Sequence, residues 1–122
     1  MSGTVICRND WRARGHSGWW AFAVHRASGL ALAVFLPAHF LVLGRALTGA
    51  AALDDVLAWT ERPLVKASEV VLVLLLSVHL GGGARLLLAE FGGWRAAWQP
   101  ALIAATGGIA VSCALLFALN LV

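Results

Sequence analysis

Three long apolar stretches constrain the fold of this chain more than any other feature. Residues 27–44, 70–84 and 101–122 contain no Asp, Glu, Lys or Arg, and the middle stretch extends upstream to residue 64 if Glu69 is tolerated. About twenty helical residues cross the hydrocarbon of a bilayer, where every backbone polar group must be bonded within the protein. We therefore predict an all-α integral membrane protein, a single domain over residues 1–122 with transmembrane helices at about 19–47, 63–89 and 100–121.

Composition and charge exclude other classes of protein. The chain is 61% hydrophobic and only 12% charged, which is too little charge for a soluble domain. Its net charge of +3 comes from residues at helix ends and not from one patch, so we expect no nucleic-acid partner. The first apolar stretch follows several arginines, as in a signal peptide, but it is longer than the apolar core of about 7–15 residues that signal peptides have. We therefore expect it to be a retained helix.

The distribution of arginines predicts the orientation of the chain. Cytoplasmic loops are enriched in Lys and Arg. Arginines gather before the first helix and around the second loop, whereas basic and acidic residues balance in the first loop. We expect the N-terminus and the 85–99 loop in the cytoplasm and the C-terminus on the outer side of a bacterial inner (cytoplasmic) membrane. The arginines that set this orientation are Arg8, Arg12, Arg14, Arg85 and Arg95.

Ionisable residues at membrane depth are costly and are functional candidates by default. The fourteen residues from His25 to His39 span about 21 Å on a straight helix. This distance places His25 and Arg26 near the cytoplasmic interface and His39 beyond the midplane. His79 lies about 16 Å above the cytoplasmic end of the second helix, at a different depth from His39. Each of these two imidazoles would therefore need its own partner from another chain.

Glycines follow His79 at the positions that share its helix face. Gly82 and Gly83 lie at i+3 and i+4, and their missing side chains would let a large planar group rest against the backbone. A neutral imidazole is a good axial ligand for haem iron. Arg85, about 9 Å nearer the cytoplasm, could pair with a haem propionate, and Arg26 lies at a similar level on the first helix.

Two other interpretations of these residues remain open. His79 could be an interhelical hydrogen-bonding residue, with glycines that serve only helix packing, as in a haemless structural anchor. Alternatively, His39, Glu69 and His79 could form a proton relay in a small transporter subunit. A relay needs polar residues on one face, but Glu69 and His79 are about 80° apart in helical projection.

Two motifs resemble the cytochrome b subunit of succinate dehydrogenase. "FAVHRASGLALAVFLPAHF" (22–40) is similar to that family's first-helix signature, His-Arg-x-Ser/Thr-Gly, and "VHLGGGARLLLAEF" (78–91) is similar to its second, a His followed by Gly-x-Arg and an acid at the helix end. With the third plain helix, the resemblance spans about residues 19–120. It departs from the family at Phe22, where many members have a quinone-contacting serine, at Leu86, which replaces a histidine, and at Glu90, which replaces an aspartate.

The resemblance assigns roles residue by residue. It implies that His79 is the haem b axial ligand and that Gly83 and Arg85 lie near the haem and its propionates. It also implies that the segment His25, Arg26 and Ser28 helps to form the quinone pocket. A histidine at the position of His39 occurs in members whose anchors hold two haems, so a second haem there is left open.

The resemblance also implies a place in a larger complex. The chain would form half of a heterodimeric haem-binding helix bundle, with a second small anchor subunit supplying the opposing His. A flavoprotein subunit would oxidise succinate and an iron–sulfur subunit would carry electrons to ubiquinone or menaquinone. No catalytic residue is expected in this chain itself, since it has neither a nucleotide-binding glycine fingerprint nor a cysteine cluster. The direction of the reaction, succinate oxidation or fumarate reduction, is left open.

Overall fold

A computed structural model describes residues 17–93 and 95–122 of the chain. All regular secondary structure in this part is helical. The elements in chain order are α1 (Ser17–Ala46), α2 (Ala50–Thr60), α3 (Pro63–Phe91), the 3₁₀ turn η2 (Ala96–Trp98) and α4 (Gln99–Leu121). The prediction of an all-α fold is confirmed. Residues 1–16, with Arg8, Arg12 and Arg14, lie outside the described residues, so the orientation in the membrane stays a prediction.

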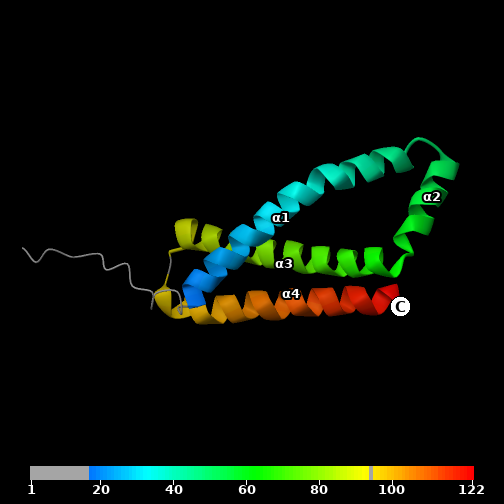
Figure 1. Ribbon diagram of the computed structural model, residues 1–122. Coiled ribbons are helices and arrows are strands. Elements are labelled where there is room, and N and C mark those ends of the chain that lie inside the picture. The colour runs from blue at the N-terminus through cyan, green and yellow to red at the C-terminus, as the bar shows by residue number, and fades with distance from the viewer. Residues whose placement is uncertain (1–16, 94) are drawn as a thin grey trace, which may run out of the picture.

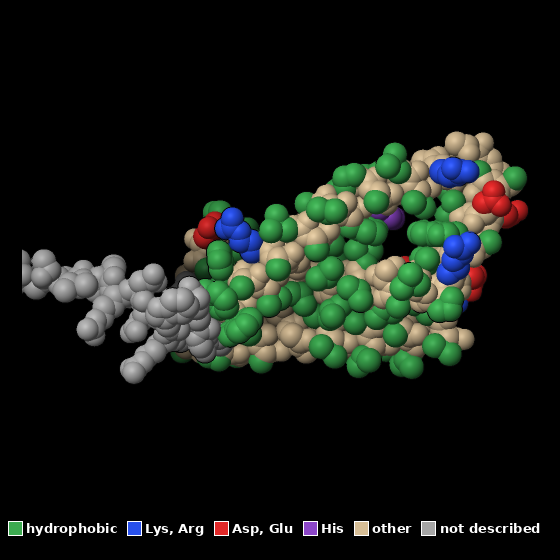
Figure 2. Space-filling model, in the orientation of Figure 1, with side chains coloured by type: hydrophobic (Ala, Val, Ile, Leu, Met, Phe, Trp, Pro, Cys, Tyr) green, Lys and Arg blue, Asp and Glu red, His purple; other side chains and the backbone are tan. Residues whose placement is uncertain are grey.

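Three helices are long and apolar enough to cross a membrane. They are Gly18–Ala46, Pro63–Phe91 and Gln99–Leu121, within a few residues of the predicted spans. Their outer surfaces are covered with large apolar side chains (Figure 2), whereas the buried residues are small, among them Ser28, Gly82, Ala110 and Ala114. Apolar groups outside and small residues between the helices are the arrangement expected in lipid, where close backbone packing holds helices together. The chain is therefore a multi-pass membrane protein.

The segment between the first two spans is a helix and not the loop that the sequence predicted. α2 places Leu53, Val56 and Leu57 at helical spacing. Thr60 is the last residue of α2 and donates its hydroxyl to the Leu57 carbonyl oxygen (2.8 Å). α3 begins at Pro63 with no side-chain cap, because proline at the first position needs no N–H partner.

The three spans do not form a parallel bundle. α3 and α4 lie side by side along their length, whereas α1 runs obliquely across them (Figure 1). α1 contacts α3 near the end where the chain enters the bundle and moves away from it toward the other end, where α2 bridges the gap. This divergence creates two distinct regions, a close helix crossing and an open groove.

Candidate functional site

The close crossing of α1 and α3 brings two histidines together. The imidazole rings of His25 and His79 are stacked, with centroids 4.4 Å apart and planes inclined by 9°. The prediction that His25 and His79 lie at different depths is therefore wrong, because their rings lie at the same level. The reason is that α1 crosses α3 obliquely, so distances counted along each helix from its own end do not give a common depth.

Hydrogen bonds fix the orientation of the His79 ring. His79 Nδ1 lies 3.2 Å from the carbonyl oxygen of His25 and 3.4 Å from Ser28 Oγ. Ser28 is fully buried and donates its own hydroxyl to the same His25 carbonyl (2.8 Å). A proton on Nδ1 satisfies this carbonyl, which assigns the tautomer in which Nε2 carries the free lone pair. This is the arrangement that orients a histidine for binding a metal through Nε2.

One nitrogen in the stacked pair lacks a partner. His25 Nδ1 is fully buried and makes no hydrogen bond within residues 17–93 and 95–122. His79 Nε2, in contrast, is not one of the buried atoms without a partner. A buried polar atom left without a partner costs about 1–3 kcal/mol, so such an atom often marks a site that another group completes.

The glycines of α3 face different neighbours. A Cβ on Gly81 would collide with Thr106 of α4, and one on Gly82 would lie 2.5 Å from His25 Nδ1. A Cβ on Gly83 would make an ordinary contact, 3.7 Å from His25 Cε1. The planar group that rests against Gly82 in this chain is therefore the His25 imidazole. Contact of Gly82 and Gly83 with a haem stays a prediction.

The crossing depends on a glycine of α1 as well. A Cβ on Gly29 would lie 2.8 Å from Cε1 of His79. Glycine at this position, within the Ser-Gly of the first motif, thus leaves room for the imidazole of the second motif. The two motifs that carry the family resemblance meet at one place in the structure.

Arg26 and Arg85, the two arginines expected beside the site, make no ion pair within the described part of the chain. The ion pair found there joins Lys66 to Glu61 (2.7 Å). Arg26 is exposed on α1 and Arg85 is half-buried on α3. Both guanidinium groups are therefore available to an anionic ligand or partner. Ser28 differs from them, because its buried hydroxyl is turned toward His79 and the His25 carbonyl, and its contact with a quinone stays a prediction.

His39 lies apart from the stacked pair. It stacks on Phe35 of its own helix, with ring centroids 5.4 Å apart, and lines the groove between α1, α2 and α3 together with Glu69. His79 does not line this groove. The groove thus gathers two members of the relay considered from the sequence but leaves out the third. Sequence reasoning did not find that His39 and Glu69 line one groove, because a helical projection compares only residues of the same helix.

Comparison with known proteins identifies the family. A family model described as the succinate dehydrogenase/fumarate reductase transmembrane subunit matches residues 8–119. A similar protein is the succinate dehydrogenase 2 membrane subunit SdhC of Mycobacterium tuberculosis, which is 32% identical over 78 residues. This match covers 64% of the present chain and 57% of the relative's length. The chain belongs to the succinate dehydrogenase/fumarate reductase transmembrane subunit family.

Proposed function

We propose that this chain is the membrane-anchor cytochrome b subunit of a succinate:quinone oxidoreductase in a bacterial inner membrane. Its partners would be a second small anchor subunit, an iron–sulfur subunit and a flavoprotein subunit. The observation that carries the proposal is the hydrogen bond between His79 Nδ1 and the His25 carbonyl oxygen (3.2 Å), which leaves Nε2 of His79 as a ligand for iron.

The residues at the crossing would hold a haem b. His79, oriented by the His25 carbonyl and flanked by Ser28, would supply one nitrogen ligand, and the second anchor subunit would supply another. Arg26 and Arg85, which have no ion-pair partner in the described residues, would bind the propionate carboxylates through charge-assisted hydrogen bonds. When bound, a haem would supply reversible one-electron transfer.

The same end of the molecule would contribute to the quinone site. Arg26 is exposed and can donate hydrogen bonds to a quinone oxygen on which negative charge develops during reduction. His25 lies one residue before it, and its buried Nδ1 lacks a partner among the described residues. Ser28 would act mainly through the position of the His79 ring. Ubiquinone and menaquinone would present the same carbonyl chemistry to these groups.

The ligand assignment is tested by the dithionite-reduced minus oxidised spectrum of the purified complex. His79→Ala should abolish the b-type bands, or one component if two haems are present, because the axial nitrogen is lost. His39→Ala is the matched control on α1: it should leave the bands intact if there is one haem and remove a separate component if His39 holds a second. An unchanged spectrum in His79→Ala, with the complex assembled, would contradict the assignment.

A second candidate function is a haemless structural anchor. The observation in its favour is the tight packing of both imidazoles at the crossing, where Gly29 accommodates His79 and Gly82 accommodates His25. In that case the stacked pair would hold α1 against α3 without a ligand, and the wild-type complex would show no reduced b-type bands. The same subunit could also serve a complex that works as a quinol:fumarate reductase, which comparison of the two reaction rates would distinguish.

A further inference from the structure

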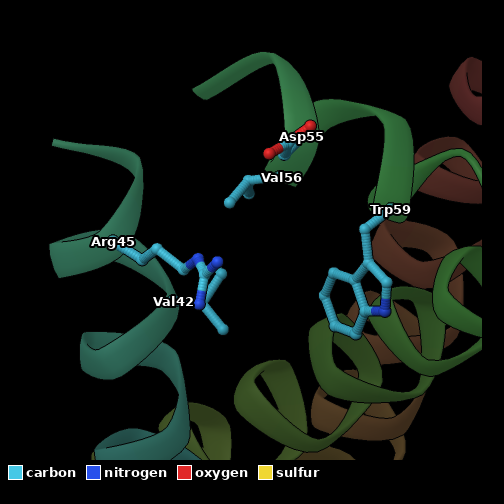
Figure 3. Close-up of a pocket in the computed structure, with 5 residues that line it drawn as sticks. All are labelled: Val42, Arg45, Asp55, Val56 and Trp59. Atoms are coloured by element: carbon cyan, nitrogen blue, oxygen red, sulfur yellow. The ribbon is translucent and has the colours of Figure 1, made fainter. Parts of the chain in front are cut away.

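A second hollow lies at the opposite end of the molecule from the stacked histidines. Beside α2 is a cleft of about 200 Å³, lined by Val42 and Arg45 of α1 and by Asp55, Val56 and Trp59 of α2 (Figure 3). The groove between α1, α2 and α3, about 560 Å³ in volume, shares Val42, Val56 and Trp59 with this cleft. Cleft and groove therefore adjoin each other, and the space-filling view shows the molecule hollowed between these helices (Figure 2).

The cleft carries two opposite charges that do not neutralise each other. Arg45 and Asp55 line it from different helices, yet no nitrogen of Arg45 lies within 4.0 Å of an Asp55 carboxylate oxygen. The ion pair found among the described residues joins Lys66 to Glu61 instead. The indole of Trp59 lies beside them (Figure 3). Arg and Trp at the end of a membrane-spanning region are typical of the level of lipid headgroups. The cleft thus presents a cation, an anion and an amphipathic ring at that level.

The groove below the cleft is mainly apolar. Its walls include Phe35, Leu43, Leu72 and Leu75, and its polar groups include His39 and Glu69. His39 precedes Arg45 by six residues, which places it about 9 Å deeper. An apolar groove of this kind suits a flexible acyl chain.

We propose that the cleft and the adjoining groove together bind one zwitterionic aminophospholipid. The phosphate would pair with Arg45, the ammonium group with Asp55, and an acyl chain would fill the groove. The imidazole of His39 would lie at the depth of the ester carbonyls, which accept hydrogen bonds. Complementary charges favour this occupant over an anionic lipid, because an anionic headgroup without an amine would leave Asp55 unpaired and repelled. The site is separate from His79 and from the residues proposed for the quinone, but it includes His39. It therefore requires that His39 does not hold a second haem.

The test is the phospholipid that stays with the complex after extensive washing in mild detergent, identified and counted by mass spectrometry. About one phosphatidylethanolamine per chain should remain in the wild type, in excess over phosphatidylglycerol. Arg45→Gln and Asp55→Asn should each reduce it about tenfold, the effect of losing one charge-assisted hydrogen bond. Arg62→Gln and Asp54→Asn are matched controls, because these charges lie in the same region but do not line the cleft.

A second pair of variants tests the groove independently of the charges. Ala38→Phe places a ring in the groove and should displace the lipid, whereas Ala33→Phe, on α1 but outside the groove, should not. Equal retention of phosphatidylethanolamine and phosphatidylglycerol, or equal loss in the target and control variants, would overturn the proposal. So would a quinone found in place of the lipid, or a photo-crosslinker at position 38 that reacts only with a partner polypeptide. Haem content measured on the same samples separates failure of this site from failure of the haem site.

Discussion

Gly82→Ala is the substitution that most directly probes the crossing of α1 and α3. The new Cβ would lie 2.5 Å from Nδ1 of His25, 2.9 Å from its Cγ and 3.1 Å from its Cβ. These atoms form the base of the side chain, so a change of ring angle alone cannot make room and the two helices must separate. Overpacking of this kind typically costs about 1–3 kcal/mol.

Gly83→Ala is the matched control for this prediction. Its Cβ would make an ordinary contact, 3.7 Å from His25 Cε1, and both positions lie within the same helix. Alanine gains about 1 kcal/mol over glycine in a helix interior, and this gain is common to the two variants. The difference between them therefore isolates the steric cost, and Gly82→Ala should be the less stable by about 1–3 kcal/mol.

Thermal unfolding of the detergent-solubilised complex measures this difference. Gly82→Ala should unfold at a clearly lower temperature than both the wild type and Gly83→Ala. Addition of His25→Ala should remove most of the penalty, because it deletes the ring that the new methyl group meets. Equal unfolding temperatures for Gly82→Ala and Gly83→Ala would refute the stacked arrangement.

Three further substitutions test separate parts of the site. Gly81→Ala should destabilise the α3–α4 contact, because the new Cβ collides with Thr106, and adding Thr106→Ala should restore the stability measured by unfolding of the complex. Gly107→Ala is the control, because its Cβ would enter open space and should have no such effect. Arg26→Leu should leave the b-type bands in place and lower the rate of quinone reduction about 10²- to 10³-fold, the usual loss for a donor to a developing negative charge. Equal loss of haem and rate would show that Arg26 acts through the haem and would contradict a separate role at the quinone. Ser28→Ala removes the 2.8 Å bond to the His25 carbonyl and should cost about 1 kcal/mol of stability while preserving the bands, so loss of the bands would mean that Ser28 is essential for holding the ring.

The spans were predictable because length and polarity alone determine them. α1, α3 and α4 match the expected helices to within a few residues, since no other structure can place apolar stretches of this length in a bilayer. α2 was missed, because the residues between the first two spans were interpreted only as a loop. The helical spacing of Leu53, Val56 and Leu57 was the signal that could have found it.

Relations between helices were harder to predict than the helices themselves. Depth counted from the end of each helix separated His25 from His79, whereas the oblique crossing stacks them. The groups that meet across helices depend on crossing angle and rotation, which a single sequence does not specify. For the same reason, sequence reasoning did not find that His39 and Glu69 line one groove or that Arg45 and Asp55 line one cleft.

The haem content of the wild-type complex tests the central claim most directly. The pyridine haemochrome assay counts haem b, and the flavin of the co-purified flavoprotein subunit gives the number of complexes. We predict one haem b per flavin, or two if His39 also serves as a ligand. A fully assembled complex with no haem b would contradict the claim that His79 is an iron ligand and would leave this chain as a structural anchor.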